Sequence, residues 1–146
     1  MQRYMRRSEG RLKDSKIYKE RQQTYKGIAR ISLDVLYFQP DEHRNIDPKQ
    51  VNFLKECFQK DRCRRLESKN YIEATIDEGS LDAALRKAGV SNRELLEESP
   101  YLRFPRGFQL RCRHGQHRIL AAREYLLPDD KWWTVELYTS GMDGLL

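Results

Sequence analysis

The segment from Phe108 to Leu126 changes its hydrophobic period at a single glycine. Before the glycine, Phe108, Leu110 and Cys112 alternate with polar residues, which is the pattern of a half-buried β-strand. After Gly115 the apolar residues recur every three to four positions, as they do on one face of an α-helix. The segment therefore predicts a strand, a one-glycine turn and a helix.

Positive charge is concentrated around this turn. Between Arg103 and Arg123 the chain has six arginines, two histidines and no carboxylate. Crowded like charges are unfavourable unless an anion neutralises them, and the free N–H groups of a helix N-terminus suit a phosphate. The sequence thus indicates a phosphate site, and the residues that we assign to it are Gly115, Gln116, His117 and Arg118. The alternative is that the glycine is no more than a turn.

Length and composition limit the class of protein. A chain of 146 residues, 38% of them hydrophobic, predicts one folded domain. No apolar run approaches the ~18 residues that span a bilayer, and the polar N-terminus does not resemble a signal peptide. The three cysteines have no disulfide-framework spacing, so we expect reduced thiols. We therefore predict no membrane partner and an intracellular location, cytoplasmic or nuclear.

The net charge of +6 is unevenly distributed. Residues 1–30 contain ten Lys or Arg and three Asp or Glu, a balance of +7, which leaves −1 for the other residues. We expect residues 1–27 to form a basic arm before a domain that spans 28–138, and residues 139–146 to form a loose tail. The arm is interpreted either as a solvated, partly disordered leader or as a segment that contacts nucleic acid phosphates.

The first half of the chain predicts a strand and a helix. Residues 28–38 alternate so that Ile31, Leu33, Val35 and Tyr37 share one face, and Pro40 ends this strand. Asp47 followed by Pro48 has the form of a capping residue and a first helical position. The helix is predicted to run to about residue 60.

The second half adds strands at 71–76 and 132–138 to the strand before Gly115. Short helices are predicted at 80–88 and 91–98, the latter with a capping box from Ser91 and Glu94. These helices form an acidic region that we interpret as an insertion of about residues 79–104. Strands separated by helices predict an α+β fold, in which helices pack on a small mixed β-sheet.

The cysteine and histidines of the same segment raise two other possibilities, a metal site and a nucleophilic thiol. The spacing of Cys112, His114 and His117 is not that of a zinc site, and we predict no metal site. Cys112 lies close to His114, but its core-facing position on the strand argues against a nucleophilic thiol.

The pattern GQHR-x-x-AA in HGQHRILAAREYL, its preceding strand and the final strand WWTVELY resemble the ParB N-terminal/sulfiredoxin superfamily. The chain is similar to the DGQHR-type domains of DNA-modification systems and most similar to a fungal family with the pattern HGQHR…AAR…KWWTV. The resemblance covers about Ile28 to Tyr138 and implies the ParB/sulfiredoxin-like variant of the α+β fold.

The resemblance also implies a nucleoside triphosphate, ATP or CTP, with or without Mg²⁺. By position, Gly115, Gln116, His117 and Arg118 would lie along the phosphates, and Arg44 would approach from the first loop. Arg113 and His114 flank this motif and complete the candidate site.

The activity is left open between nucleotide binding alone and an NTPase or phosphotransferase. A sulfinic acid reductase is disfavoured because Gln116 stands where sulfiredoxins have their catalytic cysteine. Two non-catalytic alternatives remain. One is a nucleic-acid-binding module that uses the basic arm and the arginine cluster. The other is a degenerate domain that makes protein contacts through its acidic region.

Overall fold

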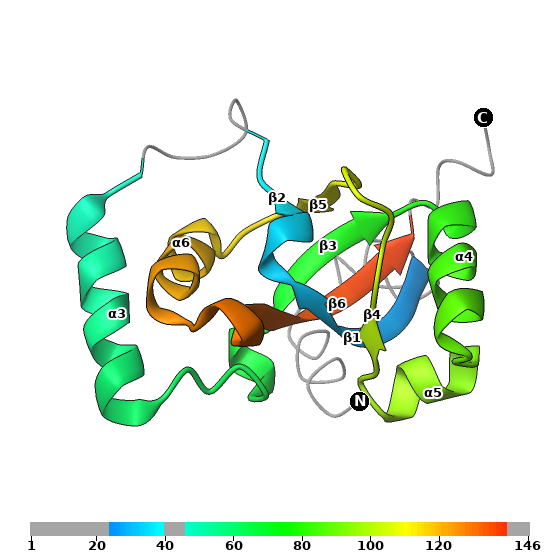
Figure 1. Ribbon diagram of the computed structural model, residues 1–146, viewed down its shortest axis with the longest axis horizontal. Coiled ribbons are helices and arrows are strands. Elements are labelled where there is room, and N and C mark those ends of the chain that lie inside the picture. Colours follow the sequence, from blue (N-terminus) through cyan, green and yellow to red (C-terminus); the bar gives the residue numbers. More distant parts are fainter. Residues whose placement is uncertain (1–23, 40–45, 140–146) are drawn as a thin grey trace, which may run out of the picture.

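The computed structural model describes residues 24–39 and 46–139 and shows helices packed around one mixed sheet (Figure 1). The strands are β1 (Tyr25–Ser32), β2 (Leu36–Tyr37), β3 (Ile72–Ile76), β4 (Tyr101–Leu102), β5 (Leu110–Cys112) and β6 (Trp132–Thr139). The helices are α3 (Pro48–Asp61), α4 (Glu78–Ala88), α5 (Asn92–Glu97) and α6 (Gln116–Tyr125). The predicted α+β class is confirmed. Most of the predicted arm, nearly all of the predicted tail and Arg44 lie outside the described residues.

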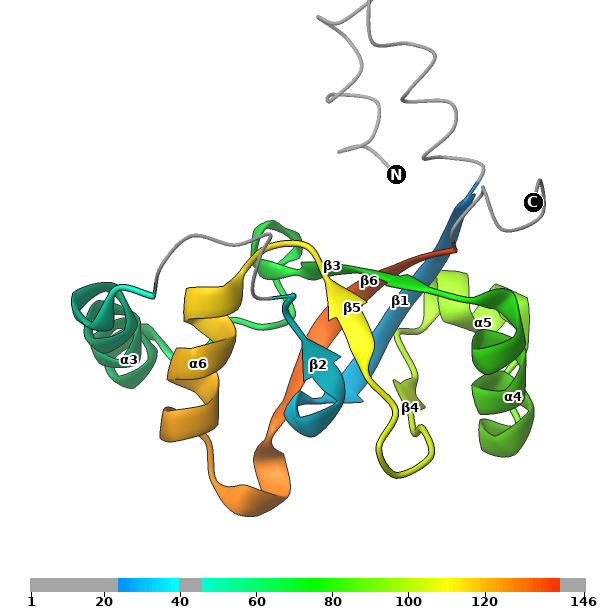
Figure 2. The same cartoon turned by 90° about the horizontal axis from the view of Figure 1, so that it is seen from above.

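Strand β6 lies inside the sheet, whose order is β2-β5-β3-β6-β1-β4. It pairs antiparallel with β1 and parallel with β3. On the two sides, β5 is antiparallel to β3 and parallel to β2, and β4 is parallel to β1. Figure 2 shows that the sheet curls, so that the short edge strands β2 and β4 lie on the same side of the central strands.

The central strands have one apolar face, which forms the core with the helices. This face carries residues such as Ile31, Ile72, Trp133 and Val135, all buried. In Figure 1, α3 and α6 lie beside one end of the sheet, and α4 and α5 lie beside the other. All four helices contribute buried apolar side chains to a single core cluster. None of the helices in the described ranges is long and apolar enough to cross a membrane.

The prediction of one continuous strand over residues 28–38 is wrong. The chain leaves β1 after Ser32, makes a 3₁₀ turn at Leu33–Val35, and then forms β2, which pairs with β5 instead of β6. The Ser32 hydroxyl accepts a hydrogen bond from the Asp34 N–H, which stabilises this turn. The turn shifts the alternation by one residue, so that Leu36 is buried and Val35 is not.

Arg123 of α6 holds the turn between β1 and β2. Its guanidinium donates to the carbonyl oxygens of Leu33 (3.0 Å) and Leu36 (2.8 Å). We expect Arg123→Met, which keeps the aliphatic stem, to lower the free energy of unfolding by about 2 kcal/mol, because two half-buried carbonyls lose a charged donor. Urea denaturation measures this effect. The exposed Arg86→Met on α4 is the control, and equal stabilities of the two variants would contradict a structural role for Arg123.

The starts of α3 and α5 agree with the sequence, whereas α4 begins at Glu78, two residues before the predicted start at residue 80. The Asp47 carboxylate accepts from the Lys49 N–H at 3.0 Å and Pro48 is the first residue of α3, as predicted. The capping box of α5 is also confirmed, with Ser91 and Glu94 bonded reciprocally. In both cases the signal lies within four residues of sequence, where no tertiary contact is needed to produce it.

The region predicted as an insertion contains a strand that the sequence did not predict. β4 has two residues, too few for alternation to be recognised, and it pairs with β1. Arg30 of β1 reinforces this edge, because its backbone N–H donates to the Pro100 carbonyl (2.9 Å) and its Nε to the Ser99 carbonyl (3.0 Å). The region therefore forms one end of the sheet and contributes Leu95, which is fully buried, to the core.

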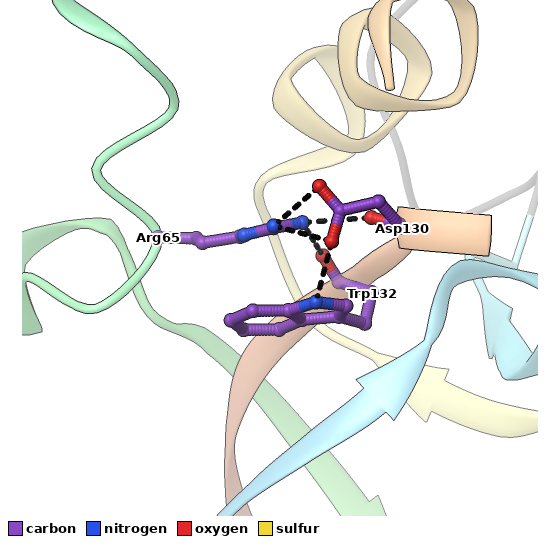
Figure 3. Close-up of polar contacts among 3 residues, drawn as sticks. All are labelled: Arg65, Asp130 and Trp132. Atoms are coloured by element: carbon purple, nitrogen blue, oxygen red, sulfur yellow. Dashed lines mark hydrogen bonds and ion pairs between the residues drawn. The ribbon is translucent and has the colours of Figure 1, made fainter. Parts of the chain in front are cut away.

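Arg65 fixes the loop after α3 to the start of β6 (Figure 3). Its Nη2 lies 2.8 and 2.9 Å from the two carboxylate oxygens of Asp130, and its Nη1 donates to the carbonyls of Asp130 and Trp132. The guanidinium also stacks 3.7 Å from the centre of the Trp132 ring. These hydrogen bonds and the stacking occupy both terminal nitrogens of Arg65, so that residue has a structural role.

Candidate phosphate site at the N-terminus of α6

Gly115 makes the turn from β5 into α6 and has no acceptable substitute there. Its φ of 94° lies in the left-handed region, and a Cβ at this position would overlap Cδ1 of Ile72 on β3. The preceding Arg113 N–H donates to the Glu73 carbonyl at 3.0 Å, which holds the turn against β3. The close approach of α6 to the sheet therefore favours glycine, because a Cβ would need a strained backbone and a displaced Ile72 side chain.

The first helical hydrogen bond of α6 runs from the Ile119 N–H to the Gly115 carbonyl at 3.0 Å. The amides of residues 116–118 precede it and have no acceptor within the helix. Gly115, the N-cap, has no side chain with which to cap them. The predicted strand–glycine–helix turn is thus present, with its amides at the positive end of the helix dipole.

A cavity of about 530 Å³ lies in front of this turn. His114, Gly115 and Arg118 line it on one side, and the start of β3 and the loop before it line the other, with Lys69 among them. Glu73 and Glu136 also line this cavity. Its volume is within the usual range of small-molecule sites.

Arg118 lines this cavity without a direct ion pair to a described residue, although Glu73 and Glu136 line the same cavity. Its side chain is partly buried, and it makes no hydrogen bond or ion pair with any residue in the described ranges. Desolvation by burial lowers the pKa of Arg118, and the nearby Cys57 thiol only partly opposes this. A half-buried guanidinium with no partner among the described residues favours the binding of an anion.

His117, predicted at the phosphates, contacts the start of α3. Its Nε2 accepts a hydrogen bond from the Asp47 N–H at 3.0 Å. This bond requires a neutral ring with its proton on Nδ1, so only Nδ1 remains as a donor. His117 thereby joins the N-termini of α3 and α6, two helices that pack against each other.

Two buried carboxylates of the site were missed by sequence reasoning. Glu73 of β3 and Glu136 of β6 are register partners on neighbouring strands. His114 Nε2 and Arg113 Nη1 each lie 3.8 Å from Glu73 Oε1. The stretch from Arg103 to Arg123 contains no carboxylate in sequence, but in the folded structure Glu73 lies close to two of its residues. A signal did exist, because each glutamate is the only charged residue of its strand.

The structure does not gather all six arginines at this cavity. Arg103 and Arg106 precede β5 and therefore lie at its other end from Gly115. Arg103 stands over the Tyr101 ring, 5.2 Å from its centre, and Arg123 is bonded to carbonyls as described above. Of these six arginines, Arg118 lines the cavity, and Arg113 lies beside Glu73, which is another lining residue.

Cys112 is buried, as its strand position predicted. Burial raises the pKa of its thiol to about 12, and the opposing effects of the Tyr37 backbone and Arg123 are smaller. Such a thiol is protonated at physiological pH and is not a nucleophile. In the part of the chain that the structure describes, no three His, Cys, Asp or Glu side chains are grouped to hold a metal ion.

We expect one fast-reacting thiol in the folded protein at about pH 8. Burial raises the pKa of Cys63 as well as that of Cys112, so both thiols stay protonated at this pH. Cys57 on α3 is partly exposed. A DTNB assay should count a single fast equivalent, which Cys57→Ser removes, and urea should release all three. Fast labelling of the Cys57→Ser variant would contradict the burial of the other two thiols.

Comparison with curated protein sequences finds no match. A solved structure with similarity to this chain is the crystal structure of the C-terminally truncated chromosome-partitioning protein ParB from Caulobacter crescentus complexed with CTP-gamma-S. The sequences are 11% identical, the TM-score is 0.45, and the match covers 78% of this chain and 45% of that chain. The chain thus spans under half the length of that protein, and a similarity this low does not assign a ligand.

Family assignment rests on a match that covers most of the chain. The model of the family described as "Protein of unknown function (DUF3723) N-terminal domain" matches residues 24–145. These residues include every described strand and helix, and Gly115 and Arg118 with them. The chain belongs to the DUF3723 N-terminal domain family.

Proposed function

We propose that this domain binds a nucleoside triphosphate, ATP or CTP, through its phosphates at the N-terminus of α6. The observation that carries the proposal is Arg118, a partly desolvated guanidinium that lines a cavity and makes no hydrogen bond or ion pair with a described residue. An anion in the cavity would supply such a partner. A phosphate matches the guanidinium geometry because it can accept two parallel N–H bonds.

The other residues at the turn support the same ligand. The amides of residues 116–118 would donate to phosphate oxygens along the helix dipole. Lys69 and His114, both exposed, line the cavity and would supply further donors to a chain of phosphates. Gln116 and Arg113 flank the turn and remain predicted contacts, as does Arg44, which lies outside the described residues. This assignment agrees with the resemblance to the ParB N-terminal/sulfiredoxin superfamily.

Glu73 and Glu136 fit a divalent cation that arrives with the nucleotide. Two carboxylates beside a triphosphate would repel it, unless a cation lies between them or they are neutralised otherwise. Mg²⁺ commonly binds one or two carboxylates together with phosphate oxygens and waters, so a dedicated three-residue cage is not required. Glu73 and Glu136 would hold this ion, which would shield the phosphate charge. Binding, not turnover, is proposed, and no catalytic residue is assigned.

Thermal unfolding of the full chain tests the proposal. ATP, CTP, GTP and UTP are added separately, with and without Mg²⁺, and inorganic triphosphate serves as the base-free control. At a hundredfold excess over Kd, a bound ligand adds about 2.7 kcal/mol of stability, which corresponds to a rise of roughly 5 °C or more for a domain of this size. No change in the melting temperature with any triphosphate at millimolar concentration would contradict the proposal.

A further inference from the structure

A second cavity lies at the other end of α6. It has a volume of about 750 Å³ and is formed by the loop that follows α3, the C-terminal end of α6 and the start of β6. We call it the α3–α6 hollow. Its lining includes Lys60, Arg62, Arg64, Leu66 and Tyr125. Because Arg118 and Tyr125 lie at opposite ends of α6, the hollow is separate from the proposed phosphate site.

Exposed cations surround the α3–α6 hollow. Lys60, Arg62 and Arg64 all have exposed side chains. Arg64 is paired with Glu67 at 2.7 Å, whereas Arg62 has no hydrogen bond or ion pair with any residue in the described ranges. Arg65 is not available to a ligand, because Asp130 and Trp132 occupy it. Asp61, an exposed carboxylate, also lines the hollow. The rim therefore carries Lys60, Arg62 and Arg64 against Asp61 and Glu67, a small excess of positive charge.

Large apolar side chains are exposed at the same place. Leu66 is 63% exposed and Tyr125 is 37% exposed, and both line the hollow. Leu127, which is 69% exposed, follows Leu126, another lining residue. Single exposed apolar residues are normal on a protein surface, but a group of them within a cationic rim is typical of a protein-binding site.

The loop that carries the arginines has an unusual backbone. Arg62 (φ 65°, ψ 179°) and Arg64 (φ 50°) both have positive φ, a region that glycine or asparagine normally occupies. Cys63 between them is buried, and Arg65 beside them is held by Asp130 and Trp132 (Figure 3). The loop is thus fixed on both sides of Arg64 and presents its arginines in one conformation, which lowers the entropic cost of binding.

We propose that the α3–α6 hollow docks an acidic segment of a partner protein that carries an aliphatic or aromatic anchor. Acidic side chains would pair with Lys60 and Arg62, and the anchor would cover Leu66 and Tyr125. Tyrosine and arginine are among the residues that most often dominate such interfaces.

Nucleic acid fits this surface less well. Base stacking needs an open ring face. One face of Trp132 is covered by Arg65 at 3.7 Å, and Tyr125 packs against Phe58 with ring centres 5.7 Å apart. The most exposed large apolar side chains at the hollow, Leu66 and Leu127, are aliphatic and cannot stack on a base as an aromatic ring does. The chemistry of the hollow therefore favours a peptide.

An NMR titration of the ¹⁵N-labelled full chain tests this proposal. The probe is a synthetic peptide of about twelve residues, made of glutamates with leucine and phenylalanine anchors. Three controls are the same peptide with serine anchors, the same peptide with lysine for glutamate, and oligo-dT of equal length. We expect the acidic, apolar peptide to shift the amides of residues 62–66 and 125–127, and each control to bind at least about tenfold more weakly there, because each lacks one of the two chemistries.

Two variants assign the effect to the hollow. Arg62→Glu should weaken the acidic peptide about tenfold, and Leu66→Ser should weaken it about as much. Both positions are exposed, so unchanged melting temperatures are expected to confirm folding. The matched control is Lys87→Glu, which reverses the charge of an exposed side chain on α4, away from the hollow. No shift at millimolar peptide, equal shifts with the lysine peptide, or tighter binding of oligo-dT at these residues would overturn the proposal.

Discussion

Gly115→Ala is expected to lower the free energy of unfolding by about 3 kcal/mol, which is a large fraction of the stability of a domain of this size. Two costs combine at this position. Alanine must adopt a φ of 94°, and its Cβ would overlap Cδ1 of Ile72, so that the buried Ile72 side chain must change rotamer or α6 and β3 must move apart. Because the same turn positions the amides of residues 116–118, nucleotide binding should weaken as well. Urea denaturation with isothermal titration measures both effects.

Two further variants separate the cost of the strained φ at position 115 from the cost of the overlap with Ile72. Gly107→Ala imposes a similar φ, 87°, but the added Cβ meets nothing within 4 Å, so it should cost only about 1 kcal/mol. Ile72→Val removes the methyl group that the Cβ added at position 115 would strike, so in a double-mutant cycle it should recover part of the loss. Additive effects of Gly115→Ala and Ile72→Val would contradict the close packing of the turn on β3.

Arg118→Met is expected to abolish the nucleotide-dependent rise in melting temperature, without lowering the melting temperature of the unliganded protein. The loss of a charged, bidentate contact corresponds to a weakening of binding of about 10- to 100-fold. In the unliganded protein, methionine replaces a desolvated cation that has no partner among the described residues, so stability should stay constant or rise. Thermal unfolding with and without nucleotide measures both.

The two outcomes distinguish a binding role of Arg118 from a structural one. The folded-state pKa of Arg118 is lowered, but it belongs to a group that titrates far above neutral pH. The penalty for its buried charge is therefore constant between about pH 5 and 9, and substitution rather than pH reveals it. The exposed Arg86→Met is the control for loss of one charge. A large drop in unliganded stability with Arg118→Met alone would indicate that Arg118 supports the fold.

Sequence reasoning succeeded where the signal is local. The start of α3 at Asp47 and Pro48, the capping box at Ser91 and Glu94, and the change of period at Gly115 each depend on a few neighbouring residues. Backbone hydrogen bonding and side-chain period determine such features almost independently of tertiary contacts. The class of fold followed from the order of these elements.

Sequence reasoning failed where long-range pairing decides. The alternation of Ile31, Leu33, Val35 and Tyr37 predicted one strand, yet the turn after Ser32 directs β2 to β5. Glu73 and Glu136 meet because β3 pairs with β6, a strand far away in the chain, in a register that no local pattern specifies. Whether each arginine has a structural role or is left to bind a ligand depends in the same way on its tertiary partner. Arg123 donates hydrogen bonds to two backbone carbonyls, whereas Arg118 donates none to the described residues.

The most direct test of phosphate binding at α6 is a ¹⁵N NMR titration of the full chain with ATP and CTP in the presence of Mg²⁺. The largest amide shifts should occur at residues 115–118 and at Glu73, and Arg118→Met should remove them. Residues 62–66 and 125–127, around the separate α3–α6 hollow, should change little, so the result is independent of the peptide experiment. Shifts that are absent at millimolar nucleotide, or that are largest away from the α6 N-terminus, would contradict nucleotide binding at this site.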